Sequence, residues 1–272
     1  WWAYPNGTSG GIVRSAYNNS YYEINNTVFT PKDSTGKNFV QLYANYIVNT
    51  YYKAVPNADG FYMDNVFYKP RVNADWNRDG VTDDQNNTTV KSWYRAGYRQ
   101  HFDTMKSLMP GTHQMGNVAD LGDEAIPYPE LDGVMNGGAI EGMIGMEGWH
   151  YETWSGVSGM LNRYHRIMDR FAAPKLGVFH HQGNPTDYQT FRYGFATCLM
   201  NDGYYYFETY GKGYFDVTLF DEYNFSLGQA LAGPSKGPWK DGIYRRDFQN
   251  GIALVNPKGN GARTVILDGT VK

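Results

Sequence analysis

The sequence predicts an α/β protein of the (β/α)8-barrel (TIM-barrel) type in which part of the barrel is missing. Two observations support this fold class. Short apolar segments alternate with amphipathic helices along the chain, which is typical of a parallel sheet covered by helices. The alternation contains five clear strand starts, whereas a closed barrel needs eight strands. We therefore expect a partial barrel over residues 1–232 and a small antiparallel β domain over residues 233–272.

The first repeat of this alternation follows an irregular N-terminal segment. Apolar residues within 38–53 recur at the three- and four-residue spacing of a helix. Pro56 and Gly60 then interrupt the pattern. Residues 61–66 are apolar at their start, which predicts a strand that delivers Asp64 to its end.

The later repeats have the same construction. Each predicted helix carries an apolar stripe, and Pro or Gly precedes each predicted strand. Pro127 and Pro129 argue against a regular helix between the second and third strands. The expected helices cover residues 90–109, 154–171 and 186–201, and the expected strands cover residues 112–117, 131–136, 176–180 and 204–208.

The pattern changes after residue 232. Gly-Pro pairs at 233–234 and 237–238 indicate a linker. Three short segments with turn residues between them then predict antiparallel strands over residues 243–248, 251–255 and 264–267. We expect this appendage to pack on the barrel.

The beginning of the chain also bears on the barrel. The chain starts at Trp1, and the first repeat begins only near residue 38, which predicts that the first two barrel units of a longer ancestor are absent. An open sheet edge exposes unpaired backbone groups. We expect residues 1–37 or a second subunit of a homo-oligomer to cover that edge. We expect the parent protein to be secreted or extracellular.

The amino-acid composition indicates which kinds of binding partner are expected. The net charge is −3 and there is no run of Lys or Arg, so we expect no nucleic acid. No apolar stretch of about 18 residues occurs, so we expect no membrane span. The single cysteine, Cys198, excludes an internal disulfide and is predicted to be a small core residue. Aromatic residues make up 17% of the chain, which is consistent with a poly- or oligosaccharide partner because sugar rings stack on aromatic rings. The alternative is that these aromatic residues only fill the core and the rim of the barrel.

Polar groups stand at or just beyond the ends of the predicted strands. In a (β/α) barrel the active site lies at the carboxyl ends of the strands. Cleavage of a glycosidic bond needs one carboxyl group as proton donor and a second as nucleophile or base. We predict Asp64, Glu141 and Glu208 as catalytic carboxylates. The predicted sugar-binding groups are Asn65, Asn117, Asp120, Asn136, His180, His181 and Gln182.

Each of these groups also has a structural interpretation as a cap of a loop. Asp64 is the strongest catalytic candidate because an apolar strand leads directly to it. Glu141 is its preferred partner, since its apolar and glycine-flanked surroundings disfavour the charged form, as a general acid requires. The spacing around His180 and His181 does not match a zinc site.

The polar loop after Asp64 resembles a calcium-binding loop. Oxygen-bearing residues alternate in it, and glycine follows the third of them, as in the sequence D-x-N-x-D-G. Asn86 stands where an EF-hand needs glutamate, so this is not an EF-hand. We predict a structural calcium site; a solvated acidic loop is the alternative. Its predicted ligands are Asp75, Asn77, Asp79, the backbone of Val81, and Asp83 or Asp84.

Three segments carry a resemblance to a known family. Residues 59–65, 137–142 and 244–257 resemble a poorly characterised group of barrel proteins known as hypothetical glycosyl hydrolases. The resemblance implies a (β/α)8 catalytic domain, a following small β domain, and catalytic acids at strand ends, which match Asp64 and Glu141. The chain departs from the family by lacking the first barrel units.

Two alternatives to a glycosidase remain open at this point. One is a non-catalytic carbohydrate-binding barrel derived from an enzyme. The other is a different barrel hydrolase or a calcium-dependent adhesion module. The distance between the carboxyl groups of Asp64 and Glu141 would discriminate, because about 5 Å suits a retaining glycosidase and about 6.5–9.5 Å an inverting one.

Overall fold

The structure is a computed structural model that describes residues 1–55, 57–118, 129–144, 159–213, 216–264 and 267. The chain divides into two compact units. The first comprises Trp1–Gly116 and Ile126–Asn136, and the second comprises Asn117–Ala125 and Gly137–Lys272. Five parallel strands alternate with helices, and a separate two-stranded antiparallel sheet follows them. The predicted α/β class is therefore confirmed, and the described strands do not close a barrel.

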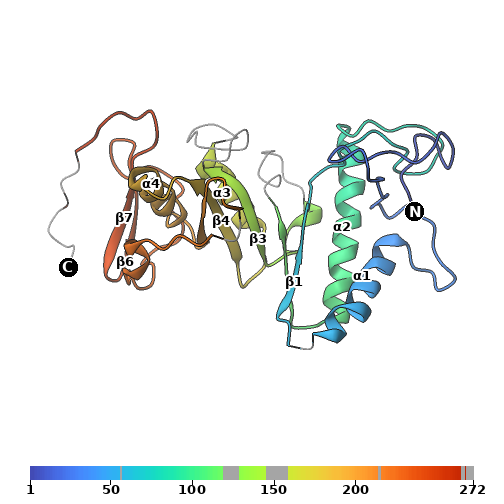
Figure 1. Cartoon of the computed structure of the whole chain (residues 1–272), viewed down its shortest axis with the longest axis horizontal. Coiled ribbons are helices and arrows are strands. Elements are labelled where there is room, and N and C mark those ends of the chain that lie inside the picture. Colours follow the sequence, from blue (N-terminus) through green and yellow to red (C-terminus); the bar gives the residue numbers. More distant parts are fainter. Residues whose placement is uncertain (56, 119–128, 145–158, 214–215, 265–266, 268–272) are drawn as a thin grey trace. The chain divides into compact units, whose positions relative to one another are not determined.

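The first unit contains one parallel strand pair and two long helices. Strand β1 (Gly60–Met63) pairs in parallel with β2 (His113–Asn117). Helices α1 (Phe39–Thr50) and α2 (Thr88–Leu108) lie side by side, as Figure 1 shows. Gly60 is required at the start of β1, because a Cβ atom there would lie 1.9 Å from the carbonyl oxygen of His113.

Two clusters of buried residues contribute to the core of the first unit. Ile47 of α1 and Met105 of α2 belong to one buried cluster, and Met63 of β1 packs against it. Trp76, which is fully buried, anchors the second cluster against Tyr94 of α2. Residues 1–37 hydrogen-bond to one another and to the loop that contains Trp76. The expected cover of the sheet edge, by this segment or by a second subunit, stays a prediction.

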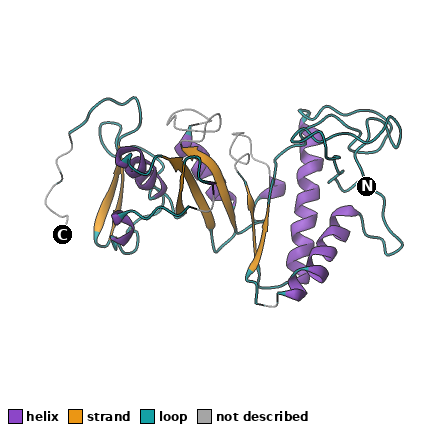
Figure 2. Cartoon of the chain, viewed as in Figure 1, coloured by secondary structure: helices purple, strands orange, loops and turns teal. Residues whose placement is uncertain are grey.

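The second unit contains three parallel strands in the order β3-β4-β5 with their helices. Figure 2 shows the strands and helices of this unit. They are β3 (Gly137–Ile144), α3 (Met160–Arg170), β4 (Leu176–Gly183), α4 (Tyr188–Cys198) and β5 (Tyr204–Thr209). Phe191 of α4 and Phe207 of β5 are buried together with Phe220, which fixes this helix against the sheet.

The C-terminal hairpin consists of β6 (Tyr244–Phe248) and β7 (Gly251–Val255). It belongs to the second compact unit. That residues 233–272 form a domain of their own stays a prediction. Val265 and Ile266, in the third predicted strand, lie outside the described residues.

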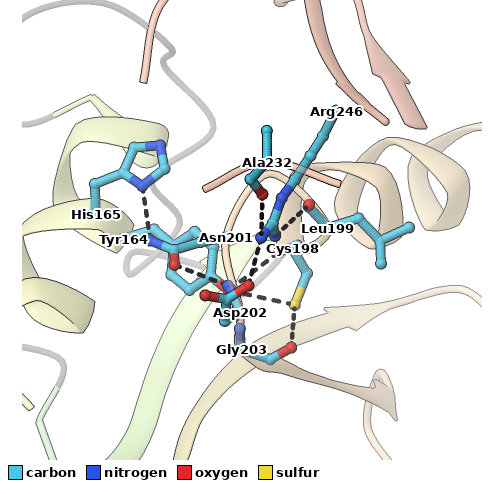
Figure 3. A network of polar contacts seen from close by, with 9 residues as sticks. All are labelled: Tyr164, His165, Cys198, Leu199, Asn201, Asp202, Gly203, Ala232 and Arg246. Atoms are coloured by element: carbon cyan, nitrogen blue, oxygen red, sulfur yellow. Dashed lines mark hydrogen bonds and ion pairs between the residues drawn. The ribbon is translucent and has the colours of Figure 1, made fainter. Parts of the chain in front are cut away.

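A polar network ties this hairpin to the turn before β5, at the strand's amino end. The guanidinium group of Arg246 donates hydrogen bonds to the carbonyl oxygens of Leu199 and Ala232 and forms an ion pair with Asp202. Figure 3 shows these groups converging on the turn that leads through Gly203 into β5. Arg246 is almost fully buried. Its contacts therefore hold the hairpin to the turn before β5 in a region shielded from water.

Most predicted elements are confirmed, with one clear exception. The strand predicted over residues 131–136 is wrong, because the chain forms a short 3-10 helix, Pro129–Leu131, followed by a turn. The strand begins instead at Gly137, where a Cβ atom would lie 2.2 Å from the carbonyl oxygen of Leu176. Glycine here permits close strand pairing and does not end a strand. Further 3-10 helices within the described residues are Tyr52–Ala54 and Asp221–Asn224.

Two smaller expectations concern Cys198 and membranes. Cys198 is a buried free thiol in the core, as predicted. Within the part of the chain that the structure describes, no helix has the length and hydropathy of a membrane span.

Candidate active site

The candidate site begins with an irregularity in β3. The register between β3 and β4 shifts between Ile140 and Ile144, which indicates a β-bulge. Gly142 lies inside it with φ +68°, a left-handed conformation that glycine adopts without strain. A bulge changes the direction of neighbouring side chains. Glu141 therefore lies inside a strand, at its bulge, and not beyond the end of a strand as predicted.

His180 of β4 connects this bulge to β5. Its Nδ1 atom accepts a hydrogen bond from the backbone N–H of Gly142 at 3.2 Å. Its Nε2 atom lies 3.0 Å from Oε2 of Glu208. Because Gly142 N–H can only donate, Nδ1 carries a lone pair, and the ring proton belongs on Nε2. His180 therefore donates to Glu208.

Glu208 is held at both oxygens. While Oε2 faces His180, Oε1 accepts a hydrogen bond from the side-chain amide of Gln182 at 2.8 Å. Glu208 is only 4% exposed. A buried carboxylate requires such donors, because an unpaired charge away from water is strongly unfavourable. These two donors hold the carboxylate in one orientation.

The alternation of side chains along β4 separates the two neighbouring histidines. In the β4–β5 register, His180 lies opposite Tyr206 and Gln182 lies opposite Glu208. The rings of His180 and Tyr206 are stacked with centroids 5.4 Å apart. His181 projects to the other face, where its Nδ1 contacts the hydroxyl group of Tyr205. His181 therefore does not share the face of His180, and its predicted role in sugar binding stays a prediction.

Asn117 and Glu141 form the second polar contact of the site. The Asn117 amide, at the end of β2, donates to Oε2 of Glu141 at 2.8 Å. Glu141 is half-buried, unlike Glu208. The second unit thus brings together five of the predicted site residues: Asn117, Glu141, His180, Gln182 and Glu208.

Burial governs the charge state of the imidazole. It lowers the pKa of His180, while the charges of Glu208 and Glu141 act in the opposite direction. Burial also raises the pKa of Tyr206, with a smaller contribution from Glu208. Near neutral pH this face therefore presents a neutral imidazole beside two carboxyl groups, which is suited to hydrogen bonding and proton transfer.

Asp64 lies in the first unit, directly after β1, with its side chain exposed. Both of its oxygens accept hydrogen bonds from Asn65, one from the backbone N–H and one from the side-chain amide, each at 2.9 Å. Asn65 has φ +56° and its carbonyl oxygen accepts a hydrogen bond from Tyr98. The strand-end position of Asp64 is as predicted, and its catalytic role stays a prediction.

Asn136 has a structural role in place of the predicted one. Asn136 precedes β3, whereas the sequence analysis placed it at the end of a strand. Its side-chain oxygen accepts a hydrogen bond from the backbone N–H of Gln114 at 3.0 Å, which is a structural role. Asp120 lies outside the described residues.

The acidic loop of the first unit is organised by its own carboxylates. Asp75 is buried and accepts hydrogen bonds from the backbone N–H groups of Asp79 and Gly80. Asn77 also accepts from Asp79, and Asp79 accepts from Val81. The remaining predicted ligands do the same locally: Asp83 accepts from Trp76 and Asp84 accepts from Asn86.

Like charges accumulate in this loop. Burial raises the pKa of Asp83, and the nearby charges of Asp79 and Asp75 add to the rise, against the lowering effect of backbone donors such as Trp76. Among the described residues, no group of three or more His, Cys, Asp or Glu side chains is arranged to hold a metal ion. The calcium site therefore stays a prediction.

Two residues of the site were not predicted from the sequence. Gly142 was seen only as a flank of Glu141, although a glycine within an apolar strand is a known sign of a bulge. Tyr206 precedes Glu208 by two residues, so the period of a strand places both on one face. That periodicity, applied to 180, 182, 206 and 208 together, could have identified the shared face.

Comparison with known protein families identifies a match. The sequence profile of hypothetical glycosyl hydrolase family 15 matches residues 10–252, which is most of the chain. No curated protein matches the sequence.

Proposed function

We propose, since the chain belongs to hypothetical glycosyl hydrolase family 15, that it hydrolyses O-glycosidic bonds of a poly- or oligosaccharide. One observation carries this proposal beyond the family name. Glu141, His180, Gln182 and Glu208 come from three neighbouring parallel strands. Hydrogen bonds join Glu208 to His180 and Gln182, and His180 accepts from the backbone N–H of Gly142, the residue next to Glu141. Carboxyl groups supported by amides and an imidazole are the groups that glycosidic cleavage requires.

Glu141 is the proposed proton donor. It is half-buried, so its carboxyl group can reach a bound sugar, and Asn117 fixes one of its oxygens. Protonation of the glycosidic oxygen by Glu141 would allow the bond to the anomeric carbon to break. The leaving sugar departs as an alcohol that carries the proton.

Asp64 is the proposed second carboxylate, acting on the anomeric carbon directly or through water. It is exposed at the end of β1. Glu208 is less suited to this role because it is buried, whereas Asp64 is exposed. We assign Glu208 to holding His180 and Gln182 in place. Asn65 and Gln182 are proposed to bind sugar hydroxyl groups.

The test is a screen of the purified chain against polysaccharides and aryl glycosides, followed by variants on any substrate that is cleaved. Glu141→Gln and Asp64→Asn should each lower kcat by about 100-fold or more. The loss for Glu141→Gln should be much smaller on aryl glycosides with activated leaving groups, which do not need protonation. Asp169→Asn and Glu222→Gln, whose carboxylates pair with exposed Lys236 and Arg192, serve as controls. A wild-type rate in either site variant would contradict that residue's role.

A carbohydrate-binding protein without catalysis is the second candidate. The five described parallel strands fall short of the eight in a closed barrel, which favours it. It predicts measurable sugar binding by calorimetry with no release of reducing ends. Hydrolysis that disappears in Glu141→Gln would exclude it.

A further inference from the structure

His180 occupies a position between the two carboxylates of the second unit that sugar binding alone does not explain. Its side chain is 3% exposed. One ring nitrogen contacts Gly142 in the β3 bulge, and the other contacts Glu208. A residue so enclosed, with both nitrogens engaged by the protein, acts through its neighbours.

The contact with Gly142 permits only one protonation state of the ring. Nδ1 must be unprotonated to accept the N–H of Gly142. If His180 gained a second proton, Nδ1–H and the N–H of Gly142 would face each other as two donors. One of them would have to move, and Gly142 is the residue next to Glu141 in the bulge.

The surroundings of His180 determine whether its ring is neutral or protonated. Glu208 and Tyr206 come from β5, Gln182 from β4 and Glu141 from β3. The two carboxylates favour a protonated ring, while burial favours a neutral one, and burial has the larger effect. The neutral ring with its proton on Nε2 is therefore the resting form.

We propose that His180 is a positioning residue: its neutral Nε2–H form holds the β3 bulge through Gly142, and thereby sets the direction of the Glu141 carboxyl group. This inference rests on the proposed function insofar as Glu141 is the proton donor. It predicts an enzyme that loses activity on acidification through a change in the bulge, with Glu141 itself intact.

The first test is nuclear magnetic resonance on the full chain, which needs no substrate. Labelling with 13C-carbonyl glutamate and 15N-glycine marks only the peptides Glu141–Gly142 and Glu147–Gly148, and Glu147→Asp removes the second signal. Ring 15N shifts report the tautomer and titration of His180. We expect a neutral Nε2–H ring and a Gly142 amide signal that moves with the same midpoint as His180. A Gly142 signal that ignores the titration of His180 would overturn the proposal.

The second test compares two variants of His180. Asparagine can place an oxygen near the position of Nδ1 and accept the N–H of Gly142, whereas phenylalanine can accept nothing. On a substrate cleaved in the screen, His180→Phe should lower kcat by on the order of 100-fold with little change in KM. His180→Asn should remain about tenfold more active than His180→Phe and keep the Gly142 signal near its wild-type position. His113→Asn, at the start of β2, is the control.

Equal losses in both variants, with the Gly142 signal retained in His180→Asn, would overturn the positioning role. The two proposals can fail separately. If the Gly142 signal follows the titration of His180 in a chain that hydrolyses no substrate, the proposed function is contradicted. The same result would support the contact of His180 with the bulge.

Discussion

Glu208 accepts a hydrogen bond from His180 at 3.0 Å, and the side chains of His180 and Glu208 are 3% and 5% exposed. This contact joins β4 to β5 on the face that also carries Gln182. A buried donor that loses its acceptor costs the folded state more than an exposed one, because water cannot replace the acceptor. The contact therefore affects stability as well as the proposed chemistry.

Glu208→Leu should lower the free energy of unfolding by about 1–3 kcal/mol, since Nε2–H of His180 would lose its partner. Glu208→Gln should lower the free energy of unfolding less. Its amide oxygen can still accept from His180, and the side-chain amide of Gln182 can rotate so that its oxygen accepts from the new amide. Urea denaturation measures both. Glu222→Leu is the matched control, with a loss below about 1 kcal/mol, because its partner Arg192 is exposed. Equal losses at 208 and 222 would contradict this account.

Gly142→Ala should lower the free energy of unfolding by about 1–2 kcal/mol, because a Cβ atom is strained at its φ of +68°. It should also reduce hydrolysis, since the bulge directs Glu141. Gly133→Ala provides the control: φ is +67° there and nothing lies within 4 Å of the added Cβ atom. Gly133→Ala should show the same loss of stability with unchanged activity. Loss of activity in both variants would argue against a specific role of the bulge.

Arg246→Met should destabilise the second unit by about 1–3 kcal/mol, because the carbonyl oxygens of Leu199 and Ala232 lose a buried donor. Asp202 is 59% exposed and can be solvated, so no buried charge remains. Thermal unfolding and hydrogen exchange of β6 measure the effect. Arg245→Met is the control, since Arg245 pairs with Asp247, which is exposed. A smaller loss for Arg246→Met than for Arg245→Met would refute the fastening role.

Stability should fall on mild acidification. Burial lowers the pKa of His101, His165 and His180. A group with a lowered folded-state pKa stabilises the fold above the unfolded value of about 6.5, and this contribution is lost as the pH falls toward the folded value. The urea midpoint should therefore drop between about pH 7.5 and 5.5. The drop should be smaller in His165→Gln, because that variant lacks one of the three groups; an unchanged slope would be evidence against this assignment.

Calcium should stabilise the first unit if the loop from Asp75 to Asp84 binds it. A ligand present at about 100 times its Kd adds about 2.7 kcal/mol to the free energy of unfolding. The unfolding temperature should rise with added CaCl2, fall with chelator, and respond little to MgCl2. Asp79→Ala should abolish the response. A wild-type unfolding temperature that ignores both calcium and chelator would exclude the site.

Most elements were predictable because their signals are local. Pro and Gly bound the strands β2, β4 and β5, and the apolar stripe of α4 was read within a few residues of its observed ends, Tyr188 and Cys198. β3 was placed too early for a reason that is not local. Gly137 looked like the end of a strand, whereas it permits the close approach of Leu176 from a neighbouring strand.

The candidate site was predictable in residue type and only in part in geometry. The positions of Gln182 and Glu208 near the carboxyl ends of β4 and β5 were predictable, because polar side chains follow apolar runs there. The sequence could not tell His180 from His181, since adjacent strand residues face opposite sides and the core-facing side depends on the packing of α4. The bulge at Gly142 arises from the pairing register between β3 and β4. That register cannot be predicted from the sequence of either strand alone.

The position of Arg246 has a consequence for the order in which the chain folds during synthesis. The turn that leads into β5 contains Asp202, yet the side chain that fastens it lies 44 residues later. The segment from β3 to β5 leaves the ribosome before Arg246 does. Until Arg246 emerges, the amino end of β5 relies on contacts such as that of Tyr164 with Gly203. The nascent sheet is therefore most exposed to wrong pairing and to proteases in that interval, and a pause in translation before residue 246 would lengthen it.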